Sequence, residues 1–189
     1  MKNIVYRYSL LCSLGVLTFV PLTGILSPDS SSSQLFLSGG QNQVSRRPAS
    51  STKQYKNSTY GVTLSYPSNW QPTKGYQERF SGADGFFQIM GLSSPSTIQN
   101  VCKDALNHRL NPYGTRPQVQ RLQIQGRPAC LILPSSDQDR TLERMATLIV
   151  RYPTPIRLNG ANYNHLMLSA DKEHIRQITN GLRFTMPRR

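Results

Sequence analysis

Apolar and polar residues alternate along several short segments after residue 58, and this period of two predicts β-strands. In TYGVTLSYP, the apolar residues Val62, Leu64 and Tyr66 alternate with polar ones, which is typical of a half-buried strand. The other expected strands lie at Tyr76–Phe80, Phe86–Leu92, 118–124, 129–134, 146–153 and 182–184, with a hairpin over 155–171 that turns at Asn159-Gly160. The segments at 129–134 and 146–153 are apolar on both faces, as internal strands are.

A first helix is expected where the strand pattern stops. The segment STIQ has the form of a capping box, in which Ser96 caps the helix and Gln99 reaches back. Apolar residues then follow at helical spacing, so one face should be buried. That face consists of Ile98, Val101, Cys102 and Ala105, and the helix is expected to run to about Leu110.

A second helix is expected at Lys172–Asn180, with Asp171 as its N-cap and Gly181 at its end. The order of elements is then β-β-β-α-β-β-β-β-β-α-β. Most connections between strands are shorter than the dozen or more residues that a parallel crossover needs. The predicted fold class is therefore α+β, a mainly antiparallel sheet with two packed helices.

An apolar stretch near the N-terminus indicates export. Lys2 and Arg7 precede the uncharged run Leu10–Leu26, which is the order of a signal peptide. The run has 17 residues, at the lower edge for a membrane span, and no Ala-x-Ala site follows it. Residues 1–26 are expected to be either a cleaved signal peptide or a retained membrane anchor. The protein should lie on the periplasmic, lumenal or extracellular side of a membrane.

A polar segment separates this stretch from the rest. Residues 27–58 are rich in Ser, Gln, Asn and Gly and have little to bury, so a disordered linker is expected there. The folded domain is then 59–185. A chain of 189 residues with 37% hydrophobic content is sufficient for one such domain with a core.

The charge is strongly basic. Residues 52–189 contain 18 Lys and Arg against 8 Asp and Glu, which leaves a net charge of +10 (18 − 8). The excess is spread along the chain, without a run of five basic residues. Such a surface is either simply solvated or meets an acidic partner or an anionic membrane. Nucleic acid is not an expected partner of an exported chain.

Known catalytic and metal-binding motifs are missing. The three histidines form no paired motif, and the sequence contains no Cys-x-x-Cys, glycine-rich phosphate loop or Gly-x-Ser-x-Gly elbow. No catalytic residue, metal or cofactor is therefore predicted.

The segment RFSGADGFFQI at 79–89 allows two interpretations. Its glycines and aspartate are typical of a tight turn between strands. Alternatively, it contributes to a binding rim formed by Trp70, Tyr76, Arg79, Asp84 and Phe86. Trp70, in the turn PSNW, is itself expected to be mostly buried, unless it belongs to that rim.

A disulfide is predicted between Cys102 and Cys130. Export takes Cys12 out of the soluble part, and two cysteines in an oxidising compartment are candidates for a bridge. Cys102 lies on the apolar face of the first helix, and Cys130 lies in ACLIL on the same face as Ile132. The bridge forms if the helix covers that face of the sheet. The alternative is two separate buried thiols.

Several blocks of the sequence resemble a known domain. They are YGVTLSYPSNW, ERFSGADGFFQI, VCKDALNHRLNPYG, GRPACLILPSSDQ, ATLIVRYPTPI and NYNHLMLSADKEHI. Together they are similar to a bacterial extracytoplasmic domain that occurs alone and fused to BlaR-type membrane metallopeptidases, and the first block is shared with PsbP-like proteins. The resemblance covers 59–185. It implies an exported PsbP-like α/β sandwich without a catalytic centre, and the peptidase part is absent from this chain.

The expected function is that of an exported or membrane-tethered non-catalytic domain. It would have a sensing, ligand-binding or accessory role toward a protein or small-molecule partner. One alternative is a basic interaction module for anionic membrane or envelope surfaces. A second alternative is a hydrolase whose site the motifs do not reveal.

Overall fold

The structure is a computed structural model that describes residues 51–185. The predicted signal peptide or anchor at 1–26, and the linker up to residue 50, lie outside the described residues. Within the described part, no helix has the length and apolar character needed to cross a membrane.

The described residues form ten strands, two α-helices and a short 3-10 helix. The strands are β1 (Thr52–Asn57), β2 (Val62–Pro67), β3 (Gln71–Pro72), β4 (Arg79–Gly82), β5 (Gly85–Leu92), β6 (Gln118–Ile124), β7 (Arg127–Leu133), β8 (Met145–Leu158), β9 (Ala161–Asp171) and β10 (Arg183–Phe184). The helices are α1 (Ile98–Leu106), η1 (Arg140–Leu142) and α2 (Ile175–Gly181).

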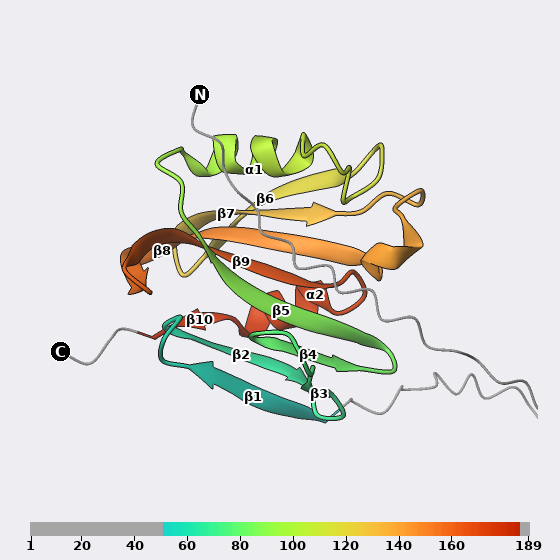
Figure 1. The fold of residues 1–189 in the computed structure, drawn as a ribbon, viewed down its shortest axis with the longest axis horizontal. Coiled ribbons are helices and arrows are strands. Elements are labelled where there is room, and N and C mark those ends of the chain that lie inside the picture. The colour runs from blue at the N-terminus through green and yellow to red at the C-terminus, as the bar shows by residue number, and fades with distance from the viewer. Residues whose placement is uncertain (1–50, 186–189) are drawn as a thin grey trace, which may run out of the picture. The chain divides into compact units, whose positions relative to one another are not determined.

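Two sheets are present in this part of the chain (Figure 1). The larger has seven strands in the order β3-β4-β5-β9-β8-β7-β6, and the smaller has three in the order β1-β2-β10. All neighbouring strands of these two sheets pair antiparallel. The predicted α+β class, with a mainly antiparallel sheet and two packed helices, is confirmed.

The main core fills the space between the two sheets. Alternate residues of β7, such as Ala129 and Leu131, belong to this core together with Ile175 and Ile178 of α2. Since side chains alternate across a strand, Cys130 faces the other side of the large sheet, where α1 contacts β7 and β8. The two helices therefore cover opposite faces of the large sheet.

The predicted start of the folded domain at residue 59 is wrong. Strand β1 occupies Thr52–Asn57, inside the predicted linker 27–58, and pairs with β2. Only Tyr55 of this strand is buried, where its ring makes edge contacts with Phe80 and Phe87. One aromatic residue in a polar segment gives no alternating pattern, so the strand depends on its neighbours rather than on its own sequence.

Two strand predictions also need correction. The strand expected at Tyr76–Phe80 begins three residues later, as β4. The strand expected at 146–153 and the first arm of the hairpin are one continuous strand, β8, with a register shift between Arg151 and Ile156. Pro153 and Pro155 lie in that shift, where a residue without an N–H is tolerated.

Both helices are shorter than predicted. The N-cap of α1 is Thr97 instead of Ser96, and the helix ends at Leu106 instead of Leu110, although its predicted buried face is confirmed. Helix α2 begins at Ile175, so Asp171 is not its N-cap. The carboxylate of Asp171 is instead bound to Arg144 and to a backbone N–H in the turn before the helix.

Candidate functional site

The segment 79–89 forms a tight hairpin between β4 and β5. Gly82 lies opposite Gly85, and the two residues between them, Ala83 and Asp84, form the turn. Gly85 has a φ of +154°, and a Cβ placed on it would lie 2.8 Å from the Cβ of Asp171. Only glycine fits there. The tight turn predicted from the sequence is therefore present.

Trp70 supports this turn from the interior. Its side chain is buried, with 1% exposure, and its Nε1 donates to Asp84 Oδ1 at 2.6 Å. The indole ring stacks near Phe87 and meets the edge of His174 at a centroid distance of 5.0 Å. The expectation of a buried Trp70 is confirmed, and its alternative place on an exposed rim is wrong.

An open hollow of about 660 Å³ lies beside the hairpin. It brings together Tyr76, Arg79, Asp84 and Phe86, the other four residues of the predicted rim. The remaining lining residues are Thr73, Ser81, Gly82, Ala83, Gly85, Glu143, Arg144 and Asp171. Of these, Glu143, Arg144 and Asp171 were not predicted, since they come from distant parts of the sequence.

Arg79 is the central side chain of the hollow. Its guanidinium carbon lies 4.0 Å from the ring centroid of Phe86 and 5.0 Å from that of Tyr76. Both distances are within the range of cation–π interactions. Its Nη2 pairs with Glu143 Oε2. The Nε atom is buried and has no hydrogen-bond partner among the described residues.

The segment after η1 brings two charged side chains to the hollow. Glu143 and Arg144 both have positive φ, 52° and 56°, which is unfavourable for residues other than glycine. Glu143 reaches Arg79, and Arg144 binds Asp171 through two hydrogen bonds of 2.9 and 3.0 Å. These ion pairs help to offset the backbone strain.

Two groups of the hollow, Asp84 and Arg144, have pKa shifts that favour their charged forms. The hydrogen bond from Trp70 is the main cause that lowers the pKa of Asp84, and the nearby His174, 3.5 Å away, contributes less. The hydrogen bond to Asp171 raises the pKa of Arg144. Over residues 51–185, no cluster of three or more His, Cys, Asp or Glu side chains is arranged to hold a metal ion.

A second hollow, of about 500 Å³, lies near the start of β6 and the end of β7. Three of its polar side chains already bond one another, since the hydroxyls of Thr115 and Ser135 both donate to Asp137. These bonds, first that from Ser135, lower the pKa of Asp137 to about 2. Because no aromatic ring lines this hollow, it is the weaker candidate for a ligand site.

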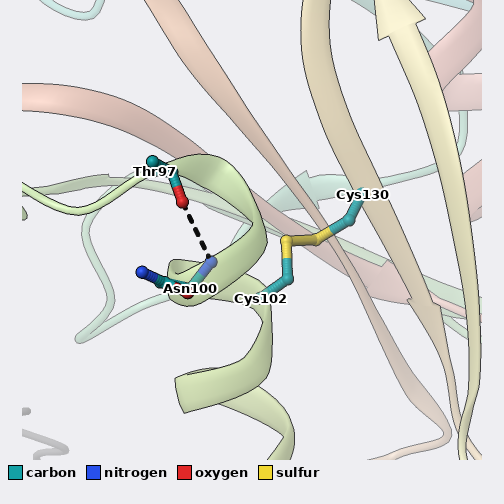
Figure 2. The surroundings of a disulfide bond; sticks show 4 residues. All are labelled: Thr97, Asn100, Cys102 and Cys130. Atoms are coloured by element: carbon teal, nitrogen blue, oxygen red, sulfur yellow. Dashed lines mark hydrogen bonds between the residues drawn. A yellow bond between two sulfur atoms is a disulfide. The ribbon is translucent and has the colours of Figure 1, made fainter.

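The predicted disulfide is present (Figure 2). Cys102 of α1 is bonded to Cys130 of β7, with a Cα–Cα distance of 6.6 Å. The bridge fixes α1 to the face of the large sheet opposite the main core. The alternative of two separate thiols is wrong.

The comparisons with known proteins assign the chain to no family. No protein-family model matches the chain, and no curated protein matches it. Among solved structures, the chain is similar to that titled "Solution Structure of Cyanobacterial PsbP (CyanoP) from Synechocystis sp. PCC 6803", with 13% identity and a TM-score of 0.41. The match covers 77% of this chain and 98% of that one. At this level of similarity, the fold class rests on the strands and helices described above.

Proposed function

We propose that the protein is an exported or membrane-tethered binding domain without a catalytic centre. Its ligand, a small molecule or the end of a partner chain, occupies the hollow beside the β4–β5 hairpin. The observation that carries this proposal is the position of Arg79, stacked on two aromatic rings in a hollow of about 660 Å³.

The size and the lining of the hollow support binding. Ligand sites usually have about 300–1,000 Å³ and combine ring surfaces with a few placed polar groups. Tyr76 is 50% exposed, so one face of its ring is open to a ligand. The floor is rigid because Trp70 packs directly behind the glycines of the turn.

The direction of the pKa shifts supports a non-catalytic role. A general acid or base works best with a pKa near the operating pH. In the hollow, the lowered pKa of Asp84 and the raised pKa of Arg144 both move away from neutrality. These groups are suited to binding and orienting a ligand.

The disulfide supports export, because such bonds persist mainly in oxidising compartments. Export gives the hollow access to molecules outside the cytoplasm. The choice between a cleaved signal and a retained anchor at 1–26 remains part of the proposal.

A co-purification experiment tests the proposed function. The full chain is purified from its native envelope, and bound small molecules are released and measured by mass spectrometry. We expect one compound to be enriched with the wild type and lost with Tyr76→Ala. The matched control is Gln118→Ala, in the second hollow, which should retain it. Equal recovery from the wild type and Tyr76→Ala would contradict the proposal.

A further inference from the structure

We infer that the group recognised in the hollow is a carboxylate, which binds Arg79 in place of Glu143. This inference rests on the proposed function, since it names the ligand class of the same site. It follows from a difference between the two arginines that line the hollow. Arg144 binds Asp171 through two hydrogen bonds, whereas Arg79 has a donor without a partner among the described residues.

Arg79 has an unused donor. Glu143 binds its Nη2, whereas the adjacent Nε is buried without a hydrogen-bond partner among residues 51–185. The Nε and Nη2 of a guanidinium form a fork that matches the two oxygens of a carboxylate. A ligand carboxylate in this position would satisfy both donors, which the single contact from Glu143 does not.

Glu143 is also the easier partner to displace. Its side chain is 58% exposed, and exposed ion pairs contribute little to stability. Its backbone has a positive φ, so release of its side chain removes a constraint on an unfavourable conformation. By contrast, Asp171 is only 5% exposed in its side chain and binds Arg144 through two hydrogen bonds. Arg144 should therefore keep its partner when a ligand arrives.

Arg79 is held ready for such a partner. Only 13% of its side chain is exposed, and the rings of Phe86 and Tyr76 fix its guanidinium. Little side-chain freedom is left to lose on binding, which favours affinity. The exposed ring of Tyr76 offers a surface to a planar or apolar group next to the carboxylate.

The other charges limit the ligand to one negative charge. Asp84 and Asp171 line the same hollow, and a second anionic group on the ligand would lie near them. Like charges at short distance oppose binding. A monoanion with an apolar body, such as benzoate, fits better than the doubly charged form of inorganic phosphate.

Calorimetric titration of the full chain with benzoate, benzamide and inorganic phosphate tests the inference. Benzoate should bind more tightly than the other two. Glu143→Gln removes the competing carboxylate and should tighten benzoate binding by about two- to fivefold, the range of an exposed ion pair. Arg79→Lys keeps the charge but loses the fork, and should weaken it by about tenfold or more. Arg140→Gln, outside the hollow, is the control and should leave the affinity for benzoate unchanged.

The outcomes separate the two proposals, provided that the amide spectrum of each variant shows the native fold. If benzamide or phosphate binds as tightly as benzoate, or if Glu143→Gln leaves benzoate binding unchanged, the carboxylate inference is overturned. If Tyr76→Ala still abolishes binding of those probes, the hollow remains the ligand site. If none of the probes binds the wild type, the carboxylate inference is overturned, and the proposed function is tested separately by co-purification and by titration with a broader set of compounds.

Discussion

At the residue scale, the site depends on three positions that each need a particular residue type. Gly85 closes the hairpin, Trp70 fills the space behind it, and Asp84 links the two through its hydrogen bond from the indole. Trp70→Ala removes the largest of these groups. A cost of about 3–5 kcal/mol is expected, as for other large aromatic residues deleted from a core.

Gly85→Ala should be more destabilising than Gly126→Ala. Both glycines have positive φ, 154° and 73°, so both substitutions strain the backbone, by about 1–3 kcal/mol. A Cβ on Gly126 meets nothing within 4 Å, whereas one on Gly85 lies 2.8 Å from the Cβ of Asp171. The clash should add about 1–3 kcal/mol. Urea unfolding measures both, and equal costs would show that the packing behind the turn is looser than described.

His165 should make the protein less stable in mild acid. Its side chain is buried, and burial, followed by the charge of Arg151, lowers its pKa. An unfolded histidine takes up a proton near pH 6.5, while the folded one stays neutral to a lower pH. The free energy of unfolding should therefore decrease as the pH falls from about 6.5 toward the lowered pKa of His165 in the folded protein.

His165→Gln should remove that part of the pH dependence. The measurement is urea unfolding of the wild type and the variant between pH 8 and pH 5. A wild-type slope in His165→Gln would contradict the assignment.

At the element scale, the two helices cover opposite faces of the large sheet and are anchored differently. Helix α2 is held by its apolar side chains in the main core, while α1 is tied to β7 by the disulfide. This tie was predictable because the spacing of Ile98, Val101, Cys102 and Ala105 defines the buried face of α1. The exact start of the helix was not, because Ser96 and Thr97 are both good caps.

Loss of the disulfide should cost about 3–4 kcal/mol, because the bridge joins residues 28 positions apart and restricts the unfolded chain. The double variant Cys102→Ala and Cys130→Ala measures this cost in urea unfolding. Non-reducing mass analysis checks the bond itself. Two alkylatable thiols in unfolded but unreduced protein would show that the bridge does not form.

The cap of α1 gives a matched pair of substitutions. Thr97 accepts a hydrogen bond from the backbone of Asn100, so Thr97→Ala should destabilise the protein by about 1 kcal/mol. Ser96→Ala should have a much smaller effect. If thermal unfolding shows that Ser96→Ala is the more destabilising of the two, Ser96 is the N-cap, as the capping box expected from the sequence requires.

At the scale of the whole molecule, the sequence determines the fold class better than it determines the site. Alternating patterns identify strands whose own residues are buried on one face, such as β2. They miss β1, which has one buried side chain, and they divide β8 at its prolines. Tyr76, Arg79, Asp84 and Phe86 could be grouped because they lie close together in the sequence, in the β4–β5 hairpin and the segment just before it. Glu143 is 64 residues from Arg79, and no local pattern indicates that they meet.

Amide chemical-shift mapping of the full chain tests the central claim most directly. The wild type is titrated with a set of small anionic, cationic and neutral aromatic compounds. At least one compound should change the amide chemical shifts of the protein mainly at residues 73–86 and 143–144. Shifts confined to the hollow near Ser135, shifts spread over the basic surface and abolished by salt, or no saturable shifts in the set would contradict it.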